Sequence, residues 1–130
     1  MKATAANELE GSFATAVQQG AGALLVPNDP SMIGWAEPIA ALALRHEIPT
    51  MFGNRVNVVA GGLMSYDASV TDSYRQVGVY AGRVLKGEKP ADLPIMQPTR
   101  FEFVINLKTA KALKLTIPES FLLRADEMID

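Results

Sequence analysis

The sequence predicts an α/β fold, a three-layer sandwich in which helices cover both faces of a mainly parallel sheet. The short apolar run Ala23 to Val26 is bounded by glycine and proline, which is typical of a strand buried on both faces, and a second short run, Ile48 to Phe52, is expected to form the next strand. These runs alternate with longer segments whose apolar residues recur at helical spacing. Because the connections are short, the alternation favours strand–helix–strand units with parallel strands.

The composition indicates a globular domain. Of the 130 residues, 48% are apolar and 20% are charged, and the net charge is −2 with acidic and basic residues interleaved. This balance argues against nucleic-acid binding and against a polybasic membrane surface. No window approaches the roughly 20 apolar residues of a membrane span. The lack of cysteine excludes disulfides, thiol catalysis and thiolate metal sites.

The first half of the chain is expected to form two helices and two strands. In order, these are a helix from Asn7 to Gln19, a strand from Ala23 to Val26, a helix ending near His46 and a strand from Ile48 to Phe52. Asn7 and Glu10 match a capping box at the start of the first helix. Pro38 either delays the start of the second helix or kinks it, because proline lacks the backbone N–H of an interior helical residue.

The second half contains the clearest helix, from Val70 to Lys86. Its apolar residues step by four and three positions, Ser69 and Asp72 mark its start, and Gly87 marks its end. The other elements expected are one or two helical turns from Val56 to Ala60, strands from Gly62 to Tyr66 and from Phe101 to Leu107, and helices from Thr109 to Leu113 and from Ser120 to Ile129. Residues expected in buried strands are Leu24, Leu25, Val26, Met51, Phe52, Phe103 and Ile105.

The expected sheet also indicates where a ligand would bind. In open α/β sheets, ligands lie just beyond the carboxyl ends of the strands. The residues in those places are Asn28, Asp29, Asn54, Arg55, Ser65 and Tyr66, which we take as the candidate ligand-binding set. Structural interpretations stay open beside this one. Asp29 suits an Asx turn, Asn54 suits a turn with positive φ, and Arg55 suits a solvated surface position.

Catalysis is not expected from this sequence. The single histidine, His46, lies at the predicted C-terminal end of a helix, where a protonated imidazole would interact favourably with the negative end of the helix dipole. Nucleotide-binding glycine motifs and a nucleophile elbow are absent from the sequence, and the acidic residues lack the spacing of metal ligands. We therefore predict no enzyme activity, no metal site and no cofactor.

The segment from Tyr80 to Asp130 carries a resemblance to a known family. A helix closes at Lys86-Gly87, three prolines punctuate the next segment, and then come a strand FEFVINL, a short helix TAKAL and a tail IPESFLLRADEMI. This succession resembles the C-terminal end of ABC-transporter solute-binding proteins, including the tryptophan- and tyrosine-type proteins. The resemblance continues upstream to about Asn7.

The resemblance implies a periplasmic-binding-protein type I-like fold that is incomplete. Such proteins hold a solute between two lobes, and 130 residues cannot supply both. It assigns residues 1–64 to the second lobe, residues 65–100 to a hinge crossover and a first-lobe helix, and residues 101–130 to the return strand and C-terminal helices. The helix from Val70 to Lys86, separated from its usual partners, would leave an apolar stripe exposed, and we therefore expect a homodimer.

The resemblance also implies a function: capture of an amino-acid-like solute, aromatic amino acids included, for delivery to an ABC permease outside the cytoplasm. Arg55 and Asp29 have the charges for the carboxylate and the ammonium of such a ligand. The N-terminal sequence MKATAANELEGS has no apolar core of a secretory signal. Lys114 stands where the family often has glycine, which implies a turn without positive φ. Two alternatives remain: the effector-binding core of a transcription regulator, and a self-associating remnant without solute binding.

Overall fold

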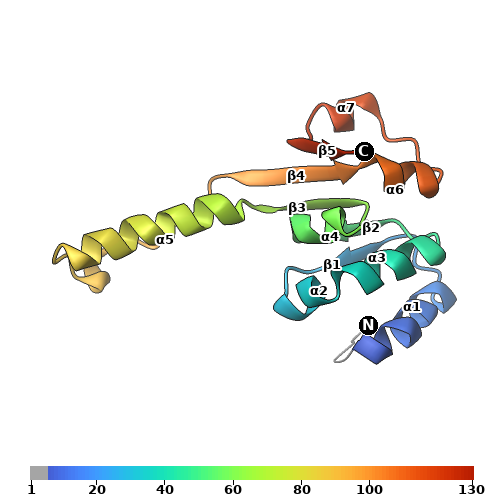
Figure 1. The fold of residues 1–130 in the computed structure, drawn as a ribbon, viewed down its shortest axis with the longest axis horizontal. Coiled ribbons are helices and arrows are strands. Elements are labelled where there is room, and N and C mark those ends of the chain that lie inside the picture. Colours follow the sequence, from blue (N-terminus) through green and yellow to red (C-terminus); the bar gives the residue numbers. More distant parts are fainter. Residues whose placement is uncertain (1–5) are drawn as a thin grey trace. The chain divides into compact units, whose positions relative to one another are not determined.

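The computed structural model describes residues 6–130, and residues 1–5, which begin the segment examined for a secretory signal, lie outside that range. Contacts divide the chain into two compact units. Unit 1 comprises the residues up to Tyr66 together with Phe103–Asp130, and unit 2 comprises Asp67–Glu102. Figure 1 labels the α-helices and the strands of both units.

A five-stranded sheet has the order β1-β2-β3-β4-β5. Its strands are β1 (Leu24–Val26), β2 (Thr50–Phe52), β3 (Met64–Ala68), β4 (Phe101–Asn106) and β5 (Glu127–Ile129). The pairs β1–β2, β2–β3 and β4–β5 are parallel, which confirms a mainly parallel sheet.

Strands β3 and β4 run antiparallel. The amide of Asn106 donates to the carbonyl of Leu63 at 2.8 Å, and the amide of Ser69 donates to the carbonyl of Arg100 at 2.9 Å, so residue numbers rise along one strand as they fall along the other. The amino ends of β4 and β5 therefore meet the carboxyl ends of β1, β2 and β3 at one edge of the sheet. This edge brings distant parts of the sequence together.

The core of unit 1 lies between two helices, α1 (Leu9–Gln18) and α3 (Ala36–Arg45), and one face of the sheet. Its buried members are Leu9, Phe13, Val26, Ile39, Ala43 and Phe52. The predicted capping box of Asn7 and Glu10 is wrong. A 3-10 turn, η1 (Ala6–Glu8), precedes α1, and Glu8 occupies the N-cap without a side-chain hydrogen bond.

Pro38 delays a helix rather than kinking one. A short helix, α2 (Pro30–Gly34), ends at Trp35, and α3 starts one residue later. Pro38 then falls in the first turn of α3, where a missing N–H leaves no hydrogen bond unmade. Trp35 packs half-buried against the core.

Four of the seven expected core-strand residues are buried, namely Val26, Phe52, Phe103 and Ile105. Leu24 and Met51 are half-buried, and Leu25 is 77% exposed, so the expectation for Leu25 is wrong. Strand β1 ends the strand order, and side chains alternate between faces along a strand. Leu25 therefore lies on the face opposite Val26, away from the helix-covered core.

The C-terminal segment departs most from expectation. Instead of one helix from Ser120 to Ile129, a short helix, α7 (Glu119–Leu122), is followed by β5. The amide of Phe103 donates to Asp126 Oδ2 and the amide of Asp126 donates to the carbonyl of Phe103, both at 2.8 Å. This reciprocal pair fixes the tail beside β4 as a strand, which outweighs its local helical pattern.

A second correction concerns Lys114, just past α6 (Leu107–Ala112). Asn106 caps α6 as its side chain accepts from the amide of Thr109. Lys114 has a φ of 55°, so the turn does require the left-handed region. The sequence puts a lysine where glycine would be less strained.

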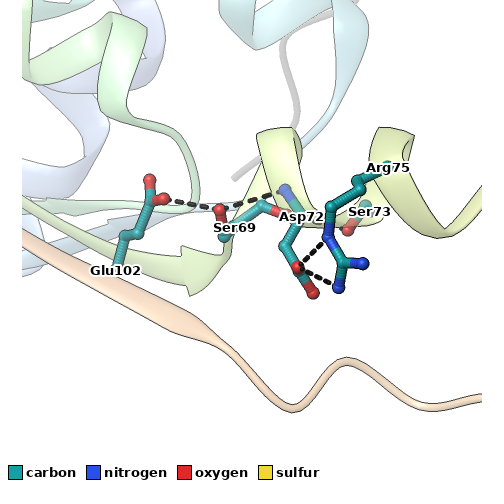
Figure 2. A network of polar contacts seen from close by, with 5 residues as sticks. All are labelled: Ser69, Asp72, Ser73, Arg75 and Glu102. Carbon is teal, nitrogen blue, oxygen red and sulfur yellow. Dashed lines mark hydrogen bonds and ion pairs between the residues drawn. The ribbon is translucent and has the colours of Figure 1, made fainter.

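Unit 2 is built around α5 (Val70–Leu85), whose start at Ser69 and end before Gly87 are as predicted. Figure 2 shows Ser69 Oγ accepting from the amide of Asp72 at 3.3 Å and donating to Glu102 Oε1 at 2.5 Å. After a 3-10 turn, η2 (Pro90–Asp92), the returning chain is held where Tyr80 Oη donates to the carbonyl of Pro94 at 2.6 Å. None of the residues of α5 is buried. We call its apolar row, Val70, Tyr74, Val77, Ala81 and Val84, the α5 stripe.

Within residues 6–130, no helix combines the length and the apolar character needed to cross a membrane.

Candidate functional site

The candidate site lies at the sheet edge where β1, β2 and β3 end. Asp29 follows β1 and caps α2, with its Oδ1 accepting from the amide of Ser31 at 2.8 Å. Asn54 follows β2 and caps α4 (Arg55–Val59), with its Oδ1 accepting from the amide of Val56 at 2.9 Å. Both are Asx caps, and Asn54 has a φ of −152°, so the interpretation of Asn54 as a positive-φ turn residue is wrong.

The loops after β1 and β2 touch each other. Asn54 Nδ2 donates to Asn28 Oδ1 at 3.4 Å, and the amide of Gly53 donates to the carbonyl of Val26 at 3.0 Å. A Cβ at Gly53 would lie 2.6 Å from the backbone nitrogen of Asn28. Glycine at position 53 is therefore what allows the two asparagines to approach, a requirement that the sequence prediction missed.

Arg55 forms a bidentate ion pair with Glu127. Arg55 Nε donates to Glu127 Oε2 and Arg55 Nη2 donates to Oε1, each at 2.6 Å. Hydrogen bonding from this guanidinium lowers the pKa of Glu127, because it favours the ionised form of the carboxylate. The two residues are 72 positions apart and meet because β5 begins at the edge where β2 ends.

Ser65 and Tyr66 lie in β3 itself rather than in a loop after it. Ser65 is buried and pairs with Phe52 of β2, whereas Tyr66 is exposed and packs edge-on against Phe103 with ring centroids 6.3 Å apart. The structure thus brings Asn28, Asn54 and their neighbours together and presents Tyr66 on the surface. It holds Ser65 inside the sheet.

Unit 2 has a concavity of its own. A groove of about 530 Å³ runs between α5 and the returning segment. Its walls include Gln76, Val77, Tyr80, Met96 and Gln97, and its surface is mainly apolar.

Glu127 is the residue of the edge that sequence reasoning did not find. The predicted helix from Ser120 to Ile129 would have included Glu127, whereas Glu127 opens a three-residue strand. A strand this short has no detectable periodicity. The only available signal was the sheet order, which a single sequence does not reveal.

A mainly parallel five-stranded sheet with polar loops where its strands end is typical of α/β domains that bind ligands. The chain belongs to the family of ABC transporter substrate binding proteins, whose family model matches residues 1–129. A comparison with curated proteins found no match.

Solved structures agree with the family. The chain is 29% identical to an ABC domain in complex with L-Trp from Streptococcus pneumonia, with a TM-score of 0.87 over 99% of this chain and 43% of that one. A conserved domain protein from Vibrio cholerae is 20% identical with a TM-score of 0.88, over 98% of this chain and 43% of that one. A ligand-free, open substrate binding protein with adhesive properties from Clostridium difficile is 20% identical with a TM-score of 0.70, over 98% and 42%. This chain therefore spans less than half the length of these proteins.

Proposed function

We propose that this chain is the C-terminal part of the solute-binding component of an ABC importer and that its ligand is an amino-acid-like solute. The observation that carries the proposal is the 29% identity, over 99% of the chain, to a protein in complex with L-Trp. The family is one of substrate-binding proteins, which supports binding without catalysis. An importer role further implies an ABC permease as partner and a location outside the cytoplasm.

The proposed site is the sheet edge formed by the candidate residues. Arg55 would bind the ligand carboxylate with guanidinium N–H groups, and Asp29 would accept from the ammonium. Asn28 and Asn54, joined to each other, would supply amide donors and acceptors. Tyr66 offers an exposed ring within β3, and Ser65 would support the site by holding β3 against β2.

Affinity in this chain alone should be weak. The chain covers 43% of the length of the L-Trp complex, so it would supply only part of the contacts that a complete cleft makes. A closed site buries about 70–90% of a small ligand. The entropy of immobilising the ligand must still be offset by the fewer contacts that remain.

We also propose that the chain forms a homodimer through the α5 stripe. Val70, Tyr74 and Val77 are all exposed and succeed one another along a single face of the helix. Large apolar patches seldom stay exposed on monomers. A second copy of α5 would complement the stripe, because steps of four and three residues are those of two helices packing along a common seam.

The test of binding is a titration of the full chain with tryptophan, tyrosine, phenylalanine and leucine, monitored by amide chemical shifts. We expect weak, saturable shifts centred on Asn28, Asn54 and Arg55. Arg55→Ala should weaken binding, whereas the control Arg83→Ala, which breaks a similar exposed ion pair in unit 2, should not. Shifts centred on Trp35 or His46, or no shifts at millimolar ligand, would contradict the proposal.

A further inference from the structure

Unit 2 has no core of its own. Tyr74, Val77 and Leu85 are exposed, although each is a large hydrophobic side chain. A compact unit of fewer than about 40 residues usually needs a disulfide, a metal or oligomerisation to be stable. The chain has no cysteine, and no group of metal-ligating side chains occurs within the described residues. Oligomerisation is the remaining route.

The α5 stripe fits a copy of itself that runs in the opposite direction. Val70 and Val84 lie seven residues before and after Val77, while Tyr74 lies three residues before it and Ala81 four after it. In an antiparallel pair of helices centred on Val77, Tyr74 of one copy therefore lies opposite Ala81 of the other, with an offset of about 1.5 Å along the axis. Each large ring then meets a small methyl group, and the remaining contacts join valine to valine.

A parallel pair would fit poorly. Tyr74 would meet the same tyrosine of the second copy, and Ala81 would meet the same alanine. One layer of the seam would then be overfilled and another would contain a void, and both faults weaken packing. The antiparallel pair avoids both, because a two-fold axis repeats the tyrosine–alanine contact on each side of Val77.

The charges of α5 lie away from the stripe. Asp72, Arg75 and Arg83 are on the opposite face of the helix by the 3.6-residue period. A second copy brings identical charges to an interface, so a self-associating face must not carry them. The stripe meets this condition, since the cores of interfaces are depleted in charged residues.

The groove of unit 2 gives the tyrosine ring a concave seat. Val77 and Ala81 of the stripe form one wall, and Met96 of the returning segment belongs to the lining as well. The hydrogen bond from Tyr80 to the carbonyl of Pro94 holds that segment beside α5. An aromatic ring that fills a mainly apolar groove is the usual form of an interface anchor.

We propose that two copies of the chain associate through an antiparallel pair of α5 helices centred on Val77, in which Tyr74 of each copy enters the groove of the other over Ala81. The inference rests on the proposed homodimer and specifies its orientation and its main contact.

Cysteine cross-linking of the full chain tests the orientation without background from native cysteines. Under mild oxidation, Val77→Cys should form a disulfide dimer by itself. Val70→Cys and Val84→Cys should each stay uncross-linked alone and should form a mixed disulfide when combined. Identical positions at either end of an antiparallel stripe lie about 21 Å apart along the axis. A disulfide requires Cα atoms within about 7 Å of each other.

An exchange of side chains tests the tyrosine–alanine contact. Tyr74→Ala and Ala81→Tyr should each weaken dimerisation roughly tenfold, the first by removing the anchor and the second by overfilling its seat. The double variant should recover most of the loss, because each ring again faces an alanine. Val79→Ala removes an exposed apolar side chain from the opposite face of α5 and serves as the control that should leave dimerisation unchanged. Sedimentation measures association, and thermal melting verifies that the variants are folded.

Disulfides in Val70→Cys alone and in Val84→Cys alone would show a parallel pair and overturn this inference while the proposed homodimer stands. A double variant that dimerises no better than the single variants would do the same. If the wild-type chain remains monomeric at high micromolar concentration, the proposed homodimer fails and this inference fails with it.

Discussion

Helices α3 and α5 show how differently the two units use an amphipathic helix. Helix α3 has 10 residues and buries Ala36, Ile39, Ala40 and Ala43 in unit 1. Helix α5 has 16 residues, a more regular apolar repeat and no buried residue. The period of a pattern fixes which side chains share a face, but the burial of that face depends on what packs against it. The α5 stripe is therefore left exposed in the described chain, whereas the apolar face of α3 is buried in the core of unit 1.

Truncation of a side chain should give the largest difference in stability between the two units. Phe52→Ala removes a fully buried ring and should lower the free energy of unfolding by about 3–5 kcal/mol. Val77→Ala, at a side chain 63% exposed in the stripe, should change it by less than about 0.5 kcal/mol in the monomer. Chemical denaturation at low protein concentration measures both. A large loss at Val77 under those conditions would show that the stripe is covered within one chain.

Added methyl groups should have opposite signs in the two units. A Cβ at Gly62 would lie 2.4 Å from Phe52 Cε2, so Gly62→Ala should destabilise by about 1–3 kcal/mol. Gly78 lies inside α5 with no atom within 4 Å of an added Cβ, so Gly78→Ala should stabilise the helix by about 0.5–1 kcal/mol. Thermal unfolding of both variants provides the comparison, and a destabilising Gly78→Ala would mean that another surface packs there.

Substitutions at the helix ends should give a smaller difference in stability between the two units. Lys114 in unit 1 has a φ of 55°, and Gly87 in unit 2 has a φ of 103°. Lys114→Gly should stabilise by about 0.5–1 kcal/mol by relieving backbone strain, and Gly87→Ala should destabilise by about 1 kcal/mol by creating it. The ion pair that Lys114 makes with Glu47 is exposed, so its loss should matter little. A destabilising Lys114→Gly in a urea titration would refute the strain argument.

The smallest effect concerns pH. Hydrogen bonding from Arg55 lowers the pKa of Glu127, and hydrogen bonding from Arg83 lowers the pKa of Glu88. A carboxyl group with a lowered folded-state pKa stabilises the fold above its unfolded pKa, and this contribution is lost as pH falls through the folded value. Glu127→Gln and Glu88→Gln should each flatten stability slightly between neutral and acidic pH. Urea midpoints at several pH values test this, and a steeper acid dependence in either variant would contradict it.

The sequence alone predicted the parts of the fold that local signals specify. Helix α5 was found because Ser69, Asp72 and Gly87 bracket a regular repeat, and each acts as expected. The mainly parallel sheet followed from alternation of elements. The burial of Leu25 and the helical tail were wrong because both depend on strand order, which is a non-local property.

For the candidate site, too, the sequence predicted the residues that local signals indicate and missed those that depend on strand order. The rule that ligands lie at the carboxyl ends of parallel strands selected Asn28 and Asn54, and the structure brings their side chains together. That they bind a ligand stays a prediction. Glu127 was missed because its position depends on the antiparallel step at β4. Gly53 was missed because a close approach of two loops leaves no pattern in one sequence.

The most direct test is amide hydrogen exchange of the full chain, measured at low and at high micromolar protein. It asks whether unit 1 is stable without a partner and whether α5 packs against a second copy of the chain. We predict that amides of Phe52 and Ile105 are strongly protected at both concentrations. Amides of α5 should exchange faster at the low concentration and become more protected at the high one, as the stripe is covered. Protection of α5 that does not change with concentration would contradict this account.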